Sequence, residues 1–214
     1  MSTTATERVY ELLRHSILTG EYPPATHLTA DSVAKRLGVS RTPVREGLRR
    51  LHAEGLVNVI ANQGAFVTAW PASEMAEVYG LRAVLEGRAA ELAATRLTHS
   101  QLDNLRTLAT RMEQAVASDD EARLSMVAQL NDRFHKLIAG AAGSRRLVTG
   151  IAALVDVPLA LNTFTLYSQE QLVRSMHHHR ELITAFAERD PLWARAAMEC
   201  HVLAGRAIYA RNAG

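Results

Sequence analysis

The sequence predicts a mostly α-helical protein, with an N-terminal winged helix-turn-helix followed by an all-α antiparallel bundle of about six helices. Three observations predict this architecture. Alanine, leucine and arginine, which favour helices, dominate the composition. From residue 73 onward, apolar residues recur every three to four positions, as on one face of a helix. Between residues 56 and 68 they instead form two short runs around a turn, which predicts a β-hairpin.

The charge distribution is more informative than the total charge. The 214 residues suffice for two small domains, and the net charge is only +2. Residues 1–70 hold 8 Lys/Arg against 6 Asp/Glu, whereas the remainder holds 16 of each. Residues 41–50 alone hold four Arg and one Glu. A local basic patch in the N-terminal third is therefore where we expect a nucleic-acid partner to bind.

Cysteine content and hydropathy indicate a cytoplasmic protein. The single cysteine, Cys200, excludes an internal disulfide framework and fits a reducing compartment. The first 17 residues have no apolar signal core. The most apolar run, 151–161, is short and is interrupted by Asp156 and Pro158, so we expect no contact with a membrane.

The first three predicted helices cover residues 5–19, 30–37 and 41–54, with a short extended link at 27–29. Gly38 allows a tight turn between the second and third helices, which makes them a helix-turn-helix. Ser40 is placed to cap the third helix.

Arginines form a stripe along the third predicted helix. Arg41, Arg45 and Arg49 recur every four residues, and the apolar residues of the same helix occupy another face. Guanidinium groups suit phosphate oxygens and the O6/N7 edge of guanine. A solvated basic face is the alternative, but the turn before this helix and the hairpin after it favour DNA binding.

The predicted hairpin has strands at 56–60 and 65–68, and after a helix-turn-helix such a hairpin is a wing. Gly64 at its tip would let the backbone approach DNA. A plain hairpin that caps a small core remains the alternative.

The motif RLGVSRTPVREGLRRL at 36–51, followed by EGLV and GAFV, resembles the winged helix-turn-helix of the GntR family of bacterial transcription regulators. The resemblance covers roughly residues 5–69. It implies binding to double-stranded operator DNA as a homodimer. It also places Arg41, Thr42, Arg45 and Arg49 on the DNA-facing helix and Gly64 in the wing.

One position departs from the family pattern. The family usually has an Arg early in the second helix, where this chain has Asp31. A carboxylate cannot replace a phosphate-contacting guanidinium. Arg36, on another part of the same helix, is the candidate to compensate in part.

The apolar periodicity of the rest of the chain predicts helices. We expect domains at 1–69 and 74–214, joined by a short linker at 70–73. Residues with capping side chains precede the predicted helices: Ser73, Thr98, Asp119 or Asp120, Ser144, Ser168 and Asp190. The helices they open cover 74–96, 101–117, 122–139, 144–167 with a kink at Pro158, 169–189 and 191–212.

Histidines in this second region are candidate metal ligands. His179 lies eleven residues before Asp190 and His201 eleven after it, so in an antiparallel hairpin both lie about 16 Å from the turn. Asn131 and His135 share a helix face at i, i+4. Three imidazoles and an amide oxygen suit Zn²⁺, Ni²⁺ or a similar divalent ion. For any single histidine, a hydrogen-bonded role in the core is the alternative.

The motifs NDRFH at 131–135, HRELI at 179–183 and AMECH at 197–201 resemble the FCD effector-binding domain of the FadR-type branch of GntR regulators. The resemblance covers residues 74–212. It implies a divalent metal held by Asn131, His135, His179 and His201, where many members have Asp at the first position. The neutral Asn would leave the site more cationic and open to an anionic effector.

Four other polar residues of this region have predicted roles. His177 and His178 lie on other faces of their helix and are interpreted as surface or dimer-contact residues. Arg82 and Glu86 are spaced i, i+4, which favours an intrahelical ion pair. The alternative is that Arg82 reaches towards a carboxylate effector.

These features predict a metabolite-responsive, DNA-binding transcription regulator, and a repressor rather than an activator. A small carboxylate at the bundle metal would modulate operator binding. One alternative is a metal-dependent hydrolase or isomerase, which the absence of an Asp or Glu in an obvious general-base position beside the ligands disfavours. The other is a regulator whose metal is purely structural.

Overall fold

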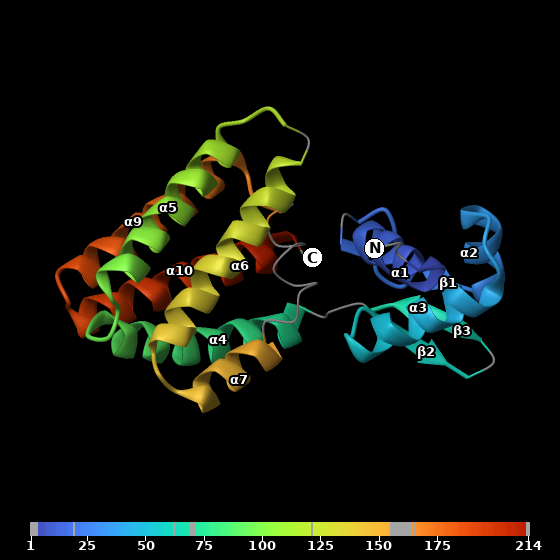
Figure 1. The fold of residues 1–214 in the computed structure, drawn as a ribbon, viewed down its shortest axis with the longest axis horizontal. Coiled ribbons are helices and arrows are strands. Elements are labelled where there is room, and N and C mark those ends of the chain that lie inside the picture. The colour runs from blue at the N-terminus through green and yellow to red at the C-terminus, as the bar shows by residue number, and fades with distance from the viewer. Residues whose placement is uncertain are drawn as a thin grey trace. The chain divides into compact units, whose positions relative to one another are not determined.

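The computed structural model describes residues 4–18, 20–61, 63–68, 72–120, 122–154, 164 and 166–212. The chain divides into two compact units, residues 1–70 and 71–214. The smaller unit contains three helices and a three-stranded sheet, and the larger unit is built from helices (Figure 1). The predicted fold class is confirmed.

The smaller unit is a winged helix-turn-helix. Its helices begin and end within two residues of the predicted bounds, and the expected extended link at residue 27 is a short strand. In chain order the elements are α1 (Ala5–Leu18), β1 (His27–Leu28), α2 (Ala30–Leu37), α3 (Arg41–Ala53), β2 (Val57–Ile60) and β3 (Gly64–Val67).

The three strands form an antiparallel sheet in the order β1-β3-β2. In the β2–β3 hairpin, Val57 lies opposite Val67 and Ile60 lies opposite Gly64. The hairpin predicted as a wing is therefore present, and β1 pairs with its inner strand.

The helix-turn-helix is stabilised at its turn. Gly38 ends α2 in the left-handed conformation, with φ 63° and ψ 33°, and its N–H donates to the carbonyl of Ala34. Thr29 caps the start of α2 by accepting a hydrogen bond from the N–H of Ser32. Ser40 stands at the N-cap of α3, but its side chain makes no capping hydrogen bond. The predicted cap at Ser40 is therefore wrong in this respect.

Close packing of α1 on α3 fixes the position of α3 in the smaller unit. A Cβ on Gly47 would lie 3.3 Å from Cγ1 of Val9, so glycine lets the two helices approach closely. Val44 and Leu51 of α3 are fully buried in this unit. The opposite face of α3 is left for its arginines, as the sequence pattern predicts.

The larger unit contains six helices within the described ranges. They form the predicted all-α bundle, in which α10 lies along α4 and α5 packs against both α6 and α9 (Figure 1). Their bounds are α4 (Ala72–Ala94), α5 (His99–Val116), α6 (Arg123–Ala141), α7 (Arg145–Leu154), α9 (Gln169–Ala187) and α10 (Pro191–Asn212). The kink expected at Pro158 lies outside the described residues.

Four of the predicted caps are present. Ser144 accepts a hydrogen bond of 3.3 Å from the N–H of Leu147 at the start of α7. Thr98 and Ser168 each form a capping box with the glutamine three residues later. One carboxylate oxygen of Asp190 accepts hydrogen bonds from the N–H groups of Leu192 and Trp193, at 3.0 Å each.

At two of the predicted helix starts the capping residue differs from the prediction. Helix α4 begins at Ala72, inside the segment expected to be a linker, so Ser73 stands inside the helix and not at its N-cap position. Helix α6 begins at Arg123 with Ala122 at its N-cap, because Asp120 instead accepts a hydrogen bond from the N–H of Ala122. Among the described residues, no helix combines the length and apolar character needed to span a membrane.

Candidate functional site

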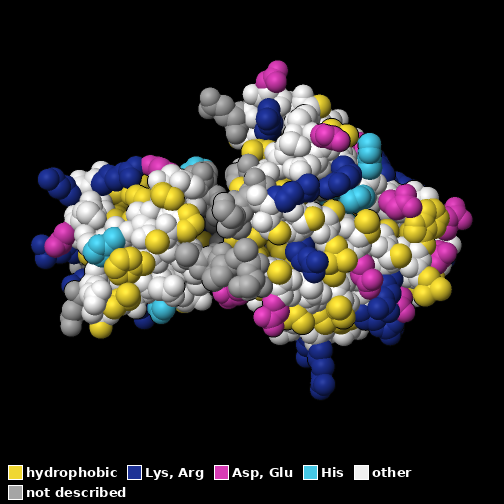
Figure 2. Space-filling model, turned by 180° about the vertical axis from the view of Figure 1, so that it is seen from behind, with side chains coloured by type: hydrophobic (Ala, Val, Ile, Leu, Met, Phe, Trp, Pro, Cys, Tyr) yellow, Lys and Arg dark blue, Asp and Glu magenta, His cyan; other side chains and the backbone are white. Residues whose placement is uncertain are grey.

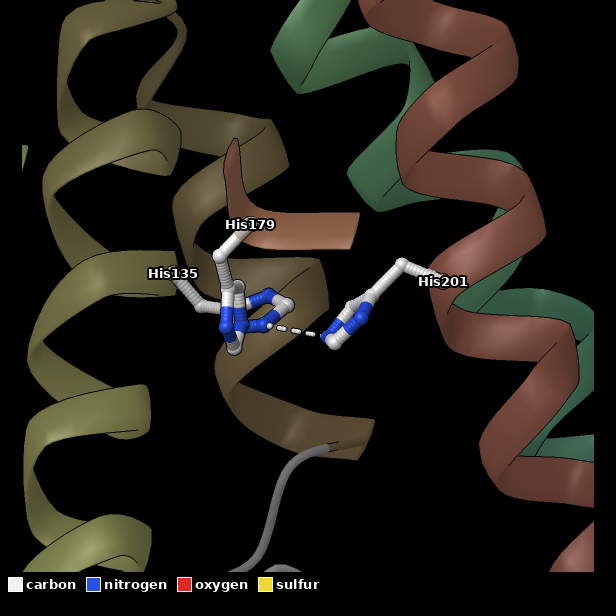
Figure 3. A group of neighbouring side chains, drawn as sticks. All are labelled: His135, His179 and His201. Carbon is white, nitrogen blue, oxygen red and sulfur yellow. Dashed lines mark hydrogen bonds between the residues drawn. The ribbon is translucent and has the colours of Figure 1, made fainter. Parts of the chain in front are cut away.

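Three histidines from three helices meet inside the larger unit. His135 lies on α6, His179 on α9 and His201 on α10, and one ring nitrogen from each lies within 4.8 Å of the others. Figure 3 shows their imidazole rings turned towards one another. The Nε2 atoms of His135 and His201 are 3.2 Å apart, and the ring centroids of His179 and His201 are 4.6 Å apart. The equal heights predicted for His179 and His201 agree with this arrangement.

Asn131 also belongs to this cluster. Its Oδ1 lies 3.1 Å from Nε2 of His179 and accepts a hydrogen bond from it, so all four predicted ligands lie together. Asn131 and His179 are buried, and His135 is 9% exposed. These side chains therefore face the interior of the bundle and not the solvent.

Two of the three histidines, His179 and His201, are kept neutral by their surroundings. Burial lowers the pKa of His179 and of His201 well below the usual value, and the neighbouring imidazoles lower it further. The Nδ1 atoms of both residues are buried without a hydrogen-bond partner among the described residues. A neutral imidazole has a free lone pair on one ring nitrogen, and a bound ion is one explanation for a buried nitrogen without a partner. The donor set fits a borderline divalent cation such as Zn²⁺ or Ni²⁺.

Glu86 on α4 holds the ring of His135. Its Oε2 lies 2.5 Å from Nδ1 of His135, and its Oε1 accepts a hydrogen bond of 2.8 Å from Nε of Arg82. Burial raises the pKa of the Glu86 carboxyl, but Arg82 and His135 together outweigh it and lower that pKa to about 2. The carboxylate of Glu86 accepts a hydrogen bond from Nδ1 of His135, so the other ring nitrogen, Nε2, faces His201.

Glu86 is the residue that sequence reasoning missed. The sequence predicts Glu86 only as the ion-pair partner of Arg82. Glu86 lies beside His135 because the face of α4 that bears it packs towards α6. Glu86 is nevertheless a poor general base, since both of its oxygens are bonded and its pKa is about 2. The sequence signal is the i, i+4 spacing of Arg82 and Glu86, which places both charges on one face of α4.

Arg82 forms the predicted ion pair and is buried. It is 8% exposed, and its guanidinium carbon lies 5.2 Å from the ring centroid of Tyr79. Burial lowers the pKa of Arg82, but the charge of Glu86 outweighs that effect and raises it. The ion-pair interpretation is confirmed, and contact with an effector stays a prediction.

The two histidines next to His179 differ from each other. His177 is exposed, as expected. His178 is half-buried, with its ring centroid 5.8 Å from that of His201. One helical step from His179 therefore brings His178 next to His201 of α10, and its role as a surface or dimer-contact residue stays a prediction.

The smaller unit has a groove of about 580 Å³ between α3 and the wing. The predicted arginine stripe forms one wall, and residues of the hairpin form the other. Lys and Arg side chains are also visible on the smaller unit in Figure 2. The residues of the groove used below are Asp31, Arg41, Arg45, Arg49 and Gly64.

The arginines of this groove differ in their partners. Arg41 forms an ion pair with Asp31, and Nη2 of Arg49 lies 2.7 Å from Oε1 of Glu46. Arg45 forms no ion pair with any of the described residues. Arg45 is therefore the most available cation of the stripe.

Two other predicted DNA contacts lie outside the groove. Thr42 is exposed but is not part of its lining. Arg36 forms an ion pair with Glu21 and donates a hydrogen bond of 2.8 Å to the hydroxyl of Tyr22. The expectation that Arg36 compensates for Asp31 finds no support in this geometry, because its guanidinium is held at the start of the link before β1.

His27 supports the tip of the wing. Gly64 has a φ of 105°, and a Cβ there would lie 3.0 Å from the carbonyl oxygen of Leu28 and 3.1 Å from Nε2 of His27. The same Nε2 is hydrogen-bonded to the carbonyl of Gln63 at 2.5 Å, and the ring stacks on Phe66. Only glycine fits at this close approach, and His27 is a wing residue that the sequence did not reveal.

Comparison with known proteins agrees with both units. Residues 5–67 match the family described as bacterial regulatory proteins, gntR family, and residues 77–204 match the FCD domain. The uncharacterized HTH-type transcriptional regulator YdhC of Bacillus subtilis is 25% identical over 195 residues, which is 91% of this chain and 84% of YdhC. The HTH-type transcriptional repressor RspR of Escherichia coli is 26% identical over 199 residues, which is 92% of this chain and 85% of RspR.

A solved structure shows the same fold. The structure of E. coli McbR/YncC aligns with all of this chain and all of its own, with a TM-score of 0.76 and 24% identity. The family and its relatives are transcription regulators and not enzymes. The chain therefore belongs to the GntR family of bacterial transcription regulators and combines its DNA-binding domain with an FCD domain.

Proposed function

We propose that this DNA-binding regulator is a repressor that binds a palindromic operator as a homodimer, with α3 in the major groove and the wing beside it. The N-terminal residues of a recognition helix reach base edges, and here they include Arg41 and Arg45. The groove between α3 and the hairpin supports this assignment. Two copies would place two such helices in successive major grooves.

We propose further that the larger unit senses a small carboxylate through a divalent metal at the histidine cluster. The observation that carries this proposal is the convergence of His135, His179 and His201 within 4.8 Å. Asn131 and these three residues would hold the ion. When bound, the ion would supply a Lewis-acidic position for a carboxylate oxygen.

Helix α4 is the candidate route for the signal. It begins at Ala72, next to the connection between the two units, and it contributes Arg82 and Glu86 to the cluster. A carboxylate that draws on the charge of Arg82 would disturb its pair with Glu86 and hence the position of α4. Binding of effector and of DNA would then be coupled.

A purely structural metal is the second candidate. An amide oxygen and three imidazoles already make four ligands, which is the number in closed structural zinc sites. In that case an ion would stabilise the bundle without giving an effector a place to bind.

Elemental analysis of the purified protein tests the metal site. We expect about one divalent ion per chain and its loss in His179→Ala, whereas the control His177→Ala, on an exposed position of the same helix, keeps it. Equal metal content in the two variants would remove the site assignment.

A thermal-shift screen of small carboxylates on metal-loaded and metal-stripped protein separates the two candidates. A sensing metal predicts a shift only in the loaded protein. A structural metal predicts a lower melting temperature after stripping and no carboxylate effect in either form.

Binding of full-length protein to operator and random DNA tests the recognition helix. We expect Arg45→Ala to weaken operator binding by roughly 1–3 kcal/mol while changing random-sequence binding less, because a base contact is lost. The control Arg8→Ala removes an exposed arginine of α1 that does not line the groove. Equal losses on both DNAs for Arg45→Ala would mean a phosphate contact only.

A further inference from the structure

We infer that Asp31 is a positioning residue for base reading: its carboxylate holds the guanidinium of Arg41 so that Arg41 reads one guanine of the operator. The inference rests on the proposed role of α3 in DNA binding and adds a specificity-determining pair to it. The observation behind it is the ion pair between Asp31 and Arg41 at the groove of the smaller unit.

The pair connects the two helices of the helix-turn-helix at their N-terminal ends. Asp31 lies in the first turn of α2, where a negative charge is favoured by the helix dipole, and Thr29 caps that turn. Arg41 is the first residue of α3. The carboxylate therefore stands on one helix and the cation at the tip of the other, where base edges are contacted.

The geometry leaves Arg41 able to bind a second partner. Asp31 contacts Nε, which carries one of the five N–H donors of a guanidinium. The four remaining donors are on the two terminal nitrogens, which can form the bidentate contact to O6 and N7 of guanine. A clamped guanidinium loses less rotamer freedom when it makes that contact.

Stability of the free protein does not explain the pair. Both side chains are well exposed, at 69% and 63%, and an exposed ion pair contributes little to folding. Nor does the pair increase general affinity for DNA, because the charge of Asp31 opposes the phosphates. At the N-terminal end of α3, the carboxylate of Asp31 reduces the local positive charge but fixes the orientation of the Arg41 guanidinium. Base reading depends on that orientation more than on charge.

Selection of binding sites from a randomised DNA library, with the full-length protein, tests the inference. Arg41→Ala identifies the position that Arg41 reads, as the one where a guanine preference disappears. We expect Asp31→Asn, which keeps the side-chain shape, to weaken that same preference. A bidentate arginine contact favours guanine over the other bases by roughly 5- to 150-fold. We expect Asp31→Asn to lose about half of this preference on a logarithmic scale, which the selection can measure.

The same variant has a second readout. Asp31→Asn should bind random DNA several-fold more tightly, with a salt dependence steeper by about one phosphate, because the freed charge of Arg41 becomes available to the backbone. Glu21→Gln is the matched control, since it releases Arg36 from an ion pair of the same unit outside the groove. It should change random-DNA affinity without changing any base preference.

The double variant Asp31→Asn/Arg41→Ala should show no further loss of preference at the guanine position than Arg41→Ala alone. An unchanged base preference in Asp31→Asn, with tighter random binding, would overturn the inference and leave Asp31 as a simple repulsive charge. If Arg45→Ala and Arg41→Ala both leave operator binding intact, the proposed role of α3 fails as well.

Discussion

Glu86 illustrates how one side chain can organise a buried polar cluster. Its two oxygens connect Arg82 to His135, so the charge of the arginine is balanced and the proton of the imidazole is placed in the same contact. An isolated charge in this position would be costly. The arrangement is stable only because three residues from two helices are satisfied together.

Removing the charge of Glu86 should therefore be costly for folding. Glu86→Gln leaves the buried Arg82 without a counterion, and breaking a buried pair typically costs roughly 3–5 kcal/mol. Urea unfolding of the metal-free protein measures the change. Asp103→Asn is the control, because it breaks an exposed i, i+3 pair with Arg106, and it should change the free energy of unfolding by less than about 1 kcal/mol. Similar losses in both variants would contradict the role given to Glu86.

The buried histidines predict a pH dependence of stability. In the unfolded chain His179 and His201 take up a proton as the pH falls through about 6.5, whereas their lowered pKa keeps them neutral in the folded protein. The unfolded state then binds more protons, so the free energy of unfolding decreases as the pH falls, by up to about 1.4 kcal/mol per pH unit for each histidine. Melting curves of metal-free protein between pH 7.5 and 5.5 should show a steeper loss for the wild type than for His201→Gln. Parallel curves would count against a neutral His201.

Helices α5 and α3 differ in how their N-termini are capped. Thr98 forms a full capping box at the start of α5, whereas Ser40 makes no capping hydrogen bond at the start of α3. We expect Thr98→Ala to destabilise α5 by about 1 kcal/mol, and Ser40→Ala to destabilise α3 by only about a few tenths of a kcal/mol. Amide hydrogen exchange of the two helices in the full chain measures both. Faster exchange of α3 in Ser40→Ala would show that Ser40 acts as a cap in solution.

Helix order and the meeting of His179 with His201 are predictable from sequence. Apolar periodicity marks each helix, and equal spacing on either side of Asp190 places the two histidines at the same height. The contact of Glu86 with His135 is not predictable in this way, because it depends on how α4 is rotated against α6. The same reason applies to Asp31 and Arg41, whose pairing depends on the crossing of α2 and α3.

In the whole molecule, carboxylate binding by the larger unit and operator binding by the smaller unit are expected to be thermodynamically coupled. If a carboxylate changes operator affinity by some factor, operator DNA must change carboxylate affinity by the same factor. Titrations of metal-loaded protein with the carboxylate, with and without saturating operator, should give this equality. Glu86→Gln should reduce the factor if α4 transmits the signal, whereas unequal factors in the wild type would point to a change in oligomeric state.

The histidine cluster also has a kinetic consequence. Glu86 and His135 are 49 residues apart in the chain, and His135 and His201 are 66 apart, so the cluster forms only when four helices have packed. A ligand that needs the whole cluster binds after the main folding barrier, and it slows unfolding while leaving the refolding rate almost unchanged. The lifetime of the folded regulator, and its resistance to proteases that act after global unfolding, would then rise with the supply of that ligand.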